Sequence, residues 1–150
     1  MSDEIKEDIE ETAEEKADKP KRVTSKDNPD TLNMDYVHLE IHQKAYDFSL
    51  YLHKKVKKYP KYEKNSLQAD TLQSMEDFLS SFESWEITRN KTRLYDADRA
   101  KRHLVRRIRM AYDLGFSAMN TKSYHYCSVE IGTIGKLLGN LIKAVSESKK

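Results

Sequence analysis

The chain has 150 residues, of which 35% are charged and 37% apolar, and a formal net charge of +2. Its 4 Gly and 3 Pro are too few for the frequent turns of a β-sandwich or barrel, so the composition indicates long helices. The sequence shows no apolar run of membrane-spanning length and no secretory signal, and its single cysteine, Cys127, excludes an intramolecular disulfide framework. We therefore expect a cytoplasmic protein without a membrane partner.

Residues 1–30 differ from the rest of the chain in charge. They carry 11 acidic and 6 basic side chains, a net charge of −5, whereas residues 31–150 carry 14 acidic and 21 basic ones, a net charge of +7. The few apolar side chains of this segment cannot bury enough surface to offset the entropy of ordering, so we predict a disordered acidic tail over residues 1–30. The tail is either a solubilising arm or an arm that competes for the basic body.

Between residues 34 and 148, apolar side chains recur every three or four positions in four segments, which is the spacing of a buried helix face. The predicted helices span about residues 35–59, 66–89, 94–119 and 124–148. Pro60 ends the first helix, Asn65 or Ser66 caps the second, and the third is expected to continue past Met119. Short connections between long helices favour an all-α fold, an up-down-up-down antiparallel four-helix bundle over residues 34–148.

The last predicted helix contains three glycines, Gly132, Gly135 and Gly139, at spacings of 3 and 4. Each glycine inside a helix costs about 1 kcal/mol relative to alanine, so three together indicate a compensating close approach of another backbone. The sequence leaves open whether that backbone belongs to the same chain or to another subunit. We predict helix packing or an oligomer contact at these glycines.

The histidines and the cysteine do not form a known catalytic or metal-binding pattern. His38 and His42 have the spacing of two metal ligands on a helix, but Glu40 lies one position away from its place in the zinc-protease motif. A di-iron bundle needs two Glu-x-x-His pairs, and none occurs in the sequence. Cys127 is expected to be a small core residue. We predict a protein without enzymatic activity, metal or cofactor.

Basic side chains predict a surface that binds nucleic acid or an acidic protein. The third helix carries an arginine ridge, defined as Arg99, Arg102, Arg106 and Arg109, with steps of 3, 4 and 3. Guanidinium groups suit phosphates, and such a ridge gives salt-sensitive, sequence-independent binding, although a plain solvated face is the alternative. The candidate binding residues are Arg89, Arg93, Arg99, Arg102, Arg106, Arg107, Arg109, Lys54, Lys57, Lys58 and Lys61. Lys55 and Lys64 belong to the same sequence cluster as these four lysines.

Three segments resemble the accessory variability determinant family, small four-helix proteins encoded beside the reverse transcriptase of diversity-generating retroelements. The similar residues are Arg93-Leu94-Tyr95-x-Ala97-Asp98 with Leu104, Ile108 and Arg109, then Gly135-Lys136-Leu137-Leu138-Gly139-Asn140-Leu141-Ile142, and Tyr59-Pro60-Lys61 followed by Glu63 and Lys64. The resemblance covers about residues 48–143 and does not include the acidic tail. Leu141 replaces the family's usual Trp, and Val105 stands where the family often has Arg.

The resemblance implies a homopentamer of four-helix protomers that binds the retroelement reverse transcriptase and the template-repeat RNA or its cDNA. Such a complex performs mutagenic reverse transcription for mutagenic retrohoming, and the polymerase chemistry belongs to the reverse transcriptase. A four-helix protein of the ribosomal-RNA intervening-sequence type, a generic helical adaptor and a small metal-dependent enzyme remain as alternatives.

Overall fold

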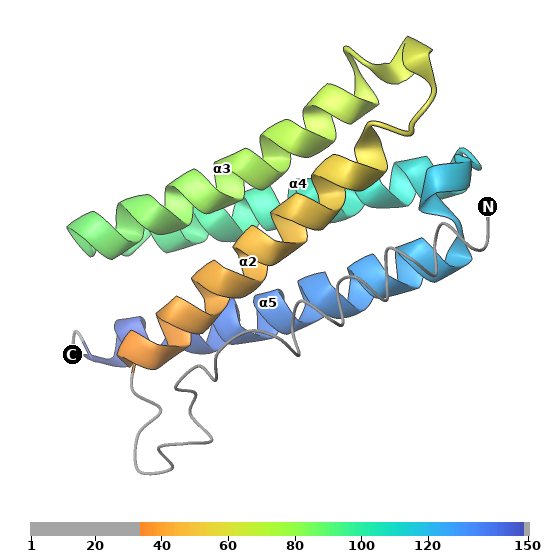
Figure 1. Ribbon diagram of the computed structural model, residues 1–150. Helices are drawn as coiled ribbons and strands as arrows, with labels where there is room; N and C mark the ends of the chain where they lie inside the picture. The colour runs from red at the N-terminus through yellow and green to blue at the C-terminus, as the bar shows by residue number, and fades with distance from the viewer. Residues whose placement is uncertain (1–33, 149–150) are drawn as a thin grey trace.

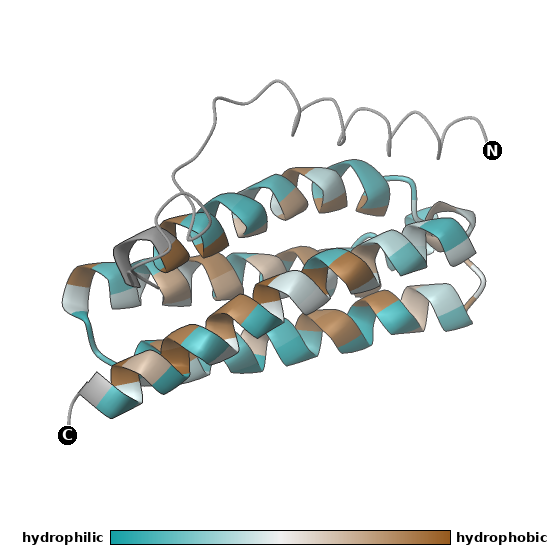
Figure 2. Cartoon of the chain, turned by 90° about the horizontal axis from the view of Figure 1, so that it is seen from below, coloured by the Kyte–Doolittle hydropathy of each residue, from teal (hydrophilic) through white to brown (hydrophobic). Residues whose placement is uncertain are grey.

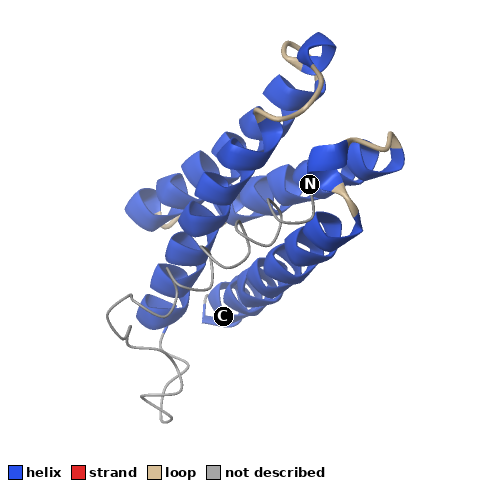
Figure 3. Ribbon diagram, turned by 45° about the vertical axis from the view of Figure 1, so that its right-hand side comes forward, coloured by secondary structure: helices blue, strands red, loops and turns tan. Residues whose placement is uncertain are grey.

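The computed structural model describes residues 34–148, and within this part of the chain it contains helices and no strand (Figure 3). The four long helices are α2 (Met34–Val56), α3 (Leu67–Thr88), α4 (Thr92–Asp113) and α5 (Thr121–Ser148). Two short 3-10 turns, η1 (Lys61–Glu63) and η2 (Ser117–Met119), lie in the connections after α2 and α4. The predicted acidic tail, residues 1–30, lies outside the described residues.

The four helices form the predicted antiparallel bundle (Figure 1). Each helix packs against the next one in the chain, and α2 also packs against α5, which closes the arrangement around one core. The contact between α3 and α4 is more extensive than that between α4 and α5. Helices α3 and α4 therefore form the closest pair of the bundle, and the other three contacts between neighbouring helices are of similar extent.

The core consists of the apolar stripes that the spacing predicted. Each of the four helices contributes side chains that are at most 2% exposed, for example Ile41, Phe82, Leu104 and Leu138. Burying a large apolar side chain of this kind stabilises a fold by about 1.5–3 kcal/mol. Apolar and polar positions alternate along every helix, as Figure 2 shows, so each helix has one face for the core and one for solvent.

The prediction that the third helix continues past Met119 is wrong, because α4 ends at Asp113. Gly115 adopts a φ of 79°, and its N–H donates to the carbonyl of Tyr112 at 3.0 Å. The N–H of Phe116 donates to the carbonyl of Ala111 at 3.2 Å, which completes a Schellman motif. Gly115, two residues beyond the end of α4, was the sequence signal for this end, since glycine adopts positive φ without a Cβ penalty.

The polar segment 120–123 starts a helix instead of separating two helices. The side-chain oxygen of Asn120 accepts a hydrogen bond from the N–H of Ser123 at 3.0 Å, which caps the first turn of α5. At the start of α3, Ser66 precedes the helix as predicted, but its hydroxyl donates to Glu63 and caps no backbone group. Glu63 instead accepts a long hydrogen bond from the N–H of Leu67, at 3.4 Å.

Candidate functional site

The arginine ridge lies on the solvent side of α4, and all four of its side chains are exposed. The buried residues of α4, among them Leu94, Leu104 and Ile108, lie on the opposite face of the same helix. Steps of 3 and 4 keep residues on one face of a helix, so the spacing of the four arginines accounts for this arrangement. The ridge therefore presents guanidinium groups away from the core, where a large partner could reach them.

Ion pairs divide the arginine ridge into two kinds of residue. Arg102 pairs with Asp98 at 3.1 Å, and Arg109 pairs with Asp113 at 3.4 Å. Both arginine side chains are more than two-thirds exposed, so each pair stabilises the helix by well under about 1 kcal/mol and is easily exchanged for another anion. Arg99 and Arg106 form no ion pair with any residue from 34 to 148 and carry the ridge's free charge.

Two further candidate arginines lie near the connection between α3 and α4. Arg89 ends α3 with a φ of 56°, and its guanidinium lies 4.5 Å from the ring centroid of Trp85. Arg93 pairs with Asp96 at 2.8 Å. Both arginines are exposed; the ion pair partly offsets the charge of Arg93, whereas the contact of Arg89 with the neutral Trp85 ring leaves its positive charge in place.

Arg107 points away from the ridge toward α3. Its Nη1 donates a hydrogen bond to the hydroxyl of Ser74 at 2.7 Å, and Ser74 is only 3% exposed. Because a buried hydroxyl without a partner is costly, this contact ties α4 to α3. Arg107 is one of the candidate binding residues, but in the structure its side chain forms a packing contact between two helices.

The lysine cluster lies at the α2–α3 connection. Lys54, Lys57, Lys58 and Lys61 are exposed there, beside a tyrosine, Tyr62, that is 78% exposed. Because consecutive helices are antiparallel, this connection lies at the same end of the bundle as the C-terminus of α4 (Figure 1). The cluster and the Arg106–Arg109 part of the ridge therefore belong to one end of the molecule.

Lys55 does not belong to the exposed lysine cluster, because it is only 1% exposed. Its Nζ lies 5.6 Å from the centroid of the Tyr51 ring, and its positive charge acts on Cys127 of α5. Burial raises the pKa of the Cys127 thiol to about 12, against a smaller lowering by Lys55. Burial also raises the pKa of the neighbouring Tyr59 hydroxyl. Cys127 lies in the core, as expected, and burial favours the protonated form of its thiol.

The two histidines with ligand spacing are held by one carboxylate. His38 Nδ1 lies 2.7 Å from one oxygen of Glu86, and His42 Nδ1 lies 2.8 Å from the other. A second carboxylate, Glu83, lies 3.8 Å from His42 Nε2. Within residues 34–148 no group of three or more His, Cys, Asp or Glu is arranged to hold a metal ion. The trio links α2 to α3, and sequence reasoning missed Glu86 because it lies 44 residues beyond His42.

The three glycines of α5 do not meet another backbone in the described part of the chain. A Cβ added at Gly132 or Gly139 would find no heavy atom within 4 Å. At Gly135 it would meet the flexible end of Lys101, with Nζ at 2.9 Å. The predicted close approach therefore has no partner between residues 34 and 148.

Comparison with known proteins gives one match. A family model described as bAvd-like matches residues 39–145, which include all of the described bundle except its first and last turns. No curated protein sequence and no solved structure matches the chain. None of the helices between residues 34 and 148 combines the length and the apolar character that a membrane span requires.

Proposed function

Since the chain belongs to the bAvd-like family of accessory variability determinants, we propose that it is the non-catalytic accessory factor of a diversity-generating retroelement. In this role it binds the retroelement's reverse transcriptase and the template-repeat RNA or its cDNA, as a homo-oligomer, most simply a pentamer. The reverse transcriptase performs the polymerase chemistry. The accessory factor holds nucleic acid and enzyme together during mutagenic reverse transcription.

The observation that carries this proposal is the outward-facing arginine ridge on a chain of this family. Arg99 and Arg106 have no competing ion pair among residues 34–148, and Arg102 and Arg109 have only exposed, weak ones. Four guanidinium groups along one helix can each neutralise a phosphate and release its counterion. Such contacts use no base edges, so they hold RNA and cDNA of any sequence.

The lysine cluster extends the proposed surface around one end of the bundle. Its ammonium groups add long-range attraction for a polyanion without fixing geometry, because lysine is a flexible point charge. The ridge supplies the directed phosphate contacts. Together the two groups favour a backbone-binding mode in which the protein positions the template and the polymerase selects the nucleotides.

The proposal is tested with the full-length chain, the template-repeat RNA and the reverse transcriptase encoded beside it. RNA binding is measured by fluorescence anisotropy over a range of salt concentrations, and enzyme binding by co-purification. We expect affinity that falls steeply with salt, and a stable complex with the reverse transcriptase. If the protein shows no RNA binding and no co-purification with the reverse transcriptase at low salt, the proposal is contradicted and a generic helical adaptor is favoured.

A further inference from the structure

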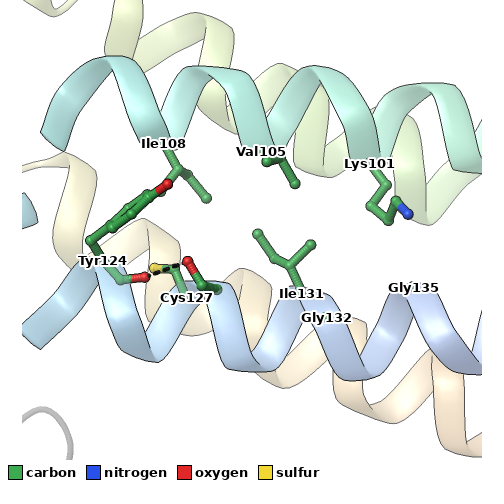
Figure 4. A pocket seen from close by; sticks show the side chains of 9 residues that line it. Lys101, Val105, Ile108, Tyr124, Cys127, Ile131, Gly132 and Gly135 are labelled. Carbon is green, nitrogen blue, oxygen red and sulfur yellow. Dashed lines mark hydrogen bonds between the residues drawn. The ribbon is translucent and has the colours of Figure 1, made fainter. Parts of the chain in front are cut away.

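A groove between α4 and α5 combines apolar walls with a cation. It has a volume of about 350 Å³ (Figure 4). Val105 and Ile108 of α4 and Ile131 of α5 line it, and Val105 is 40% exposed. A Cβ on Gly135 would lie 2.9 Å from Nζ of Lys101, so the missing side chain leaves room for this ammonium group at the groove. The groove therefore suits an occupant that has an apolar face and negative charge.

Three more cationic side chains lie along the two sides of the groove. Arg102 and Arg109 come three residues before and four residues after Val105, so both are its neighbours on the surface of α4. Lys136 comes four residues after Gly132, a lining residue, and is its neighbour on α5. All three side chains are exposed, and we call Arg102, Arg109 and Lys136 the basic flank.

Two acidic side chains of α4 offset only part of this positive charge. Asp98 is shared between Lys101 and Arg102, at 3.3 and 3.1 Å, and Asp113 pairs with Arg109 at 3.4 Å. The two arginine side chains are more than two-thirds exposed, so their pairs are weak and readily exchanged for other carboxylates. The groove and its flank therefore attract an acidic segment.

A segment with the complementary pattern occurs in the same chain, at residues 3–16. Its apolar residues Ile5, Ile9 and Ala13 recur every four positions, which is the spacing of one helix face. The segment contains eight acidic and two basic side chains, a net charge of −6. In a helix, acidic residues would stand on both sides of this apolar stripe, with Asp3, Glu10 and Glu14 on one side and Asp8 and Glu15 on the other.

The chain between this segment and the bundle is long enough to reach the groove. Residues 17–33 can extend to about 55 Å. Helix α2 begins at Met34, at the end of the bundle where α5 ends (Figure 1). From the end of α5 at Ser148 back to Gly135, the nearest lining residue, is 13 residues, or about 20 Å. The connection therefore spans this distance and the width of a helix with length to spare.

We propose that residues 3–16 dock in the α4–α5 groove of their own chain as an acidic amphipathic helix. Ile5 and Ile9 contact the apolar walls, and the acidic side chains on either side of them lie beside the basic flank. The segment has too few apolar residues to form a core by itself, and the groove supplies the apolar surface that it lacks. Because only two large apolar side chains take part, docking adds little to the stability of the bundle.

Docking makes the segment a competitor of nucleic acid, and this consequence rests on the proposed function. Arg102 and Arg109 belong both to the basic flank and to the arginine ridge, so a docked segment places carboxylates where phosphates would bind. A segment tethered to its site by a short flexible linker has an effective concentration on the order of millimolar, so even a weak contact is populated. The segment would thus reduce binding to weak polyanions and yield to a long RNA.

The first test locates the segment on the full-length protein without nucleic acid. In a Cys127→Ala background, Thr12→Cys is combined with Gly132→Cys, and a short bis-maleimide is added. A cross-link within one chain is expected, identified by peptide mass spectrometry and by a mass that stays at 17.6 kDa in denaturant. The control pair is Thr12→Cys with Gln73→Cys, at an exposed position of α3, and should link much less. Equal yields of the two pairs, or links mainly between chains, would overturn the proposal.

The second test removes the apolar stripe and leaves the bundle unchanged. Ile5→Glu with Ile9→Glu should abolish the cross-link and, although it adds two negative charges, should tighten binding of template-repeat RNA by about threefold or more, because the groove edge is no longer occupied. The matched control, Thr24→Glu with Ser25→Glu, adds the same charge outside residues 3–16. It should keep the cross-link and bind RNA no more tightly than the wild type. A cross-link that survives the isoleucine changes would overturn the docking, and equal RNA affinity of the two variants would overturn the competition.

These outcomes are separate from those that test the proposed function, because the cross-link is measured without RNA or reverse transcriptase. A protein that binds both partners but gives no preferred cross-link would reject the docking and retain the accessory role. A protein with the expected cross-link that binds neither partner would retain the docking and reject the role.

Discussion

Arg107 of α4 donates a hydrogen bond from Nη1 to the hydroxyl of Ser74 on α3, at 2.7 Å. Its neighbour in sequence, Arg106, is exposed and has no ion pair with any described residue. Two adjacent arginines of one helix thus have different tasks, because successive residues of a helix point about 100° apart. This difference allows stability and binding to be tested separately on the same helix.

We expect Arg107→Met to destabilise the fold. The substitution keeps an extended apolar side chain but removes the donor to the buried Ser74 hydroxyl, which should lower the free energy of unfolding by about 1–2 kcal/mol. Urea denaturation followed by circular dichroism measures the change. Arg106→Met is the matched control and should shift stability by less than about 0.5 kcal/mol. Equal stability of both variants would show that the Ser74 contact contributes nothing.

Reversing the charge of the ridge should weaken RNA binding without unfolding the protein. Arg99→Glu with Arg106→Glu removes the two ridge arginines that lack an ion pair among residues 34–148. We expect at least about a tenfold loss of affinity, which corresponds to about 1.4 kcal/mol. The slope of log affinity against log salt should become shallower by about 0.7–0.9 for each lost phosphate contact.

The control for charge alone is Lys136→Glu with Lys143→Glu, two exposed positions on α5 that change the net charge by the same amount. Anisotropy titrations of both double variants show whether a loss of RNA affinity comes from the ridge itself or from the change in net charge. An unchanged affinity and salt slope in the arginine variant would reduce the ridge to a solvated face and make the lysine cluster the better candidate.

Glu86→Gln should loosen the contact between α2 and α3. The Glu86 carboxylate contacts Nδ1 of both His38 and His42, and its side chain is only 17% exposed. Hydrogen bonds to a charged group are stronger than neutral ones, so we expect a loss of about 1–2 kcal/mol in the free energy of unfolding. Thermal melts at fixed pH measure it. Glu83→Gln, at the half-exposed and more distant carboxylate, should stay within about 0.5 kcal/mol of the wild type.

Cys127 should make stability depend on pH in the alkaline range. Burial raises the pKa of its thiol from 9.0 to about 12, so the native state keeps a proton that the unfolded state loses. The free energy of unfolding should therefore fall as pH rises above about 9, by up to about 1.4 kcal/mol per pH unit. Cys127→Ala should show a shallower decline between pH 9 and 10, measured by urea denaturation. An identical slope in both proteins would mean that the thiol does not contribute.

Removing residues 1–30 should leave the bundle intact. Their composition predicts a segment without a core of its own, so the melting temperature should change by no more than a few degrees. Because the deletion removes a net charge of −5, RNA binding should become stronger. Differential scanning calorimetry and anisotropy measure the two effects, and a large drop in melting temperature would show that the folding of the bundle depends on the tail.

The local features of this protein follow from its sequence alone. Apolar spacing within each segment predicted four helices and their buried faces, and basic spacing predicted an outward ridge on α4, because both depend only on the period of one helix. The family resemblance, carried by short segments of α4 and α5, is confirmed by the match to residues 39–145. The predicted end of α4 is wrong because apolar spacing continues through the turn that Gly115 makes.

Which of these residues contact one another depends on how the four helices pack. Helical spacing carries no information about the neighbour across an interface. The sequence therefore does not predict the contacts of Glu86 with His38 and of Arg107 with Ser74, or the burial of Lys55. The same holds for the glycines of α5, whose spacing predicted a close neighbour without placing it. In the structure Gly132 and Gly135 line a groove between α4 and α5, Gly139 lies outside it, and at none of the three does the backbone of another described helix come within 4 Å of where a Cβ would lie.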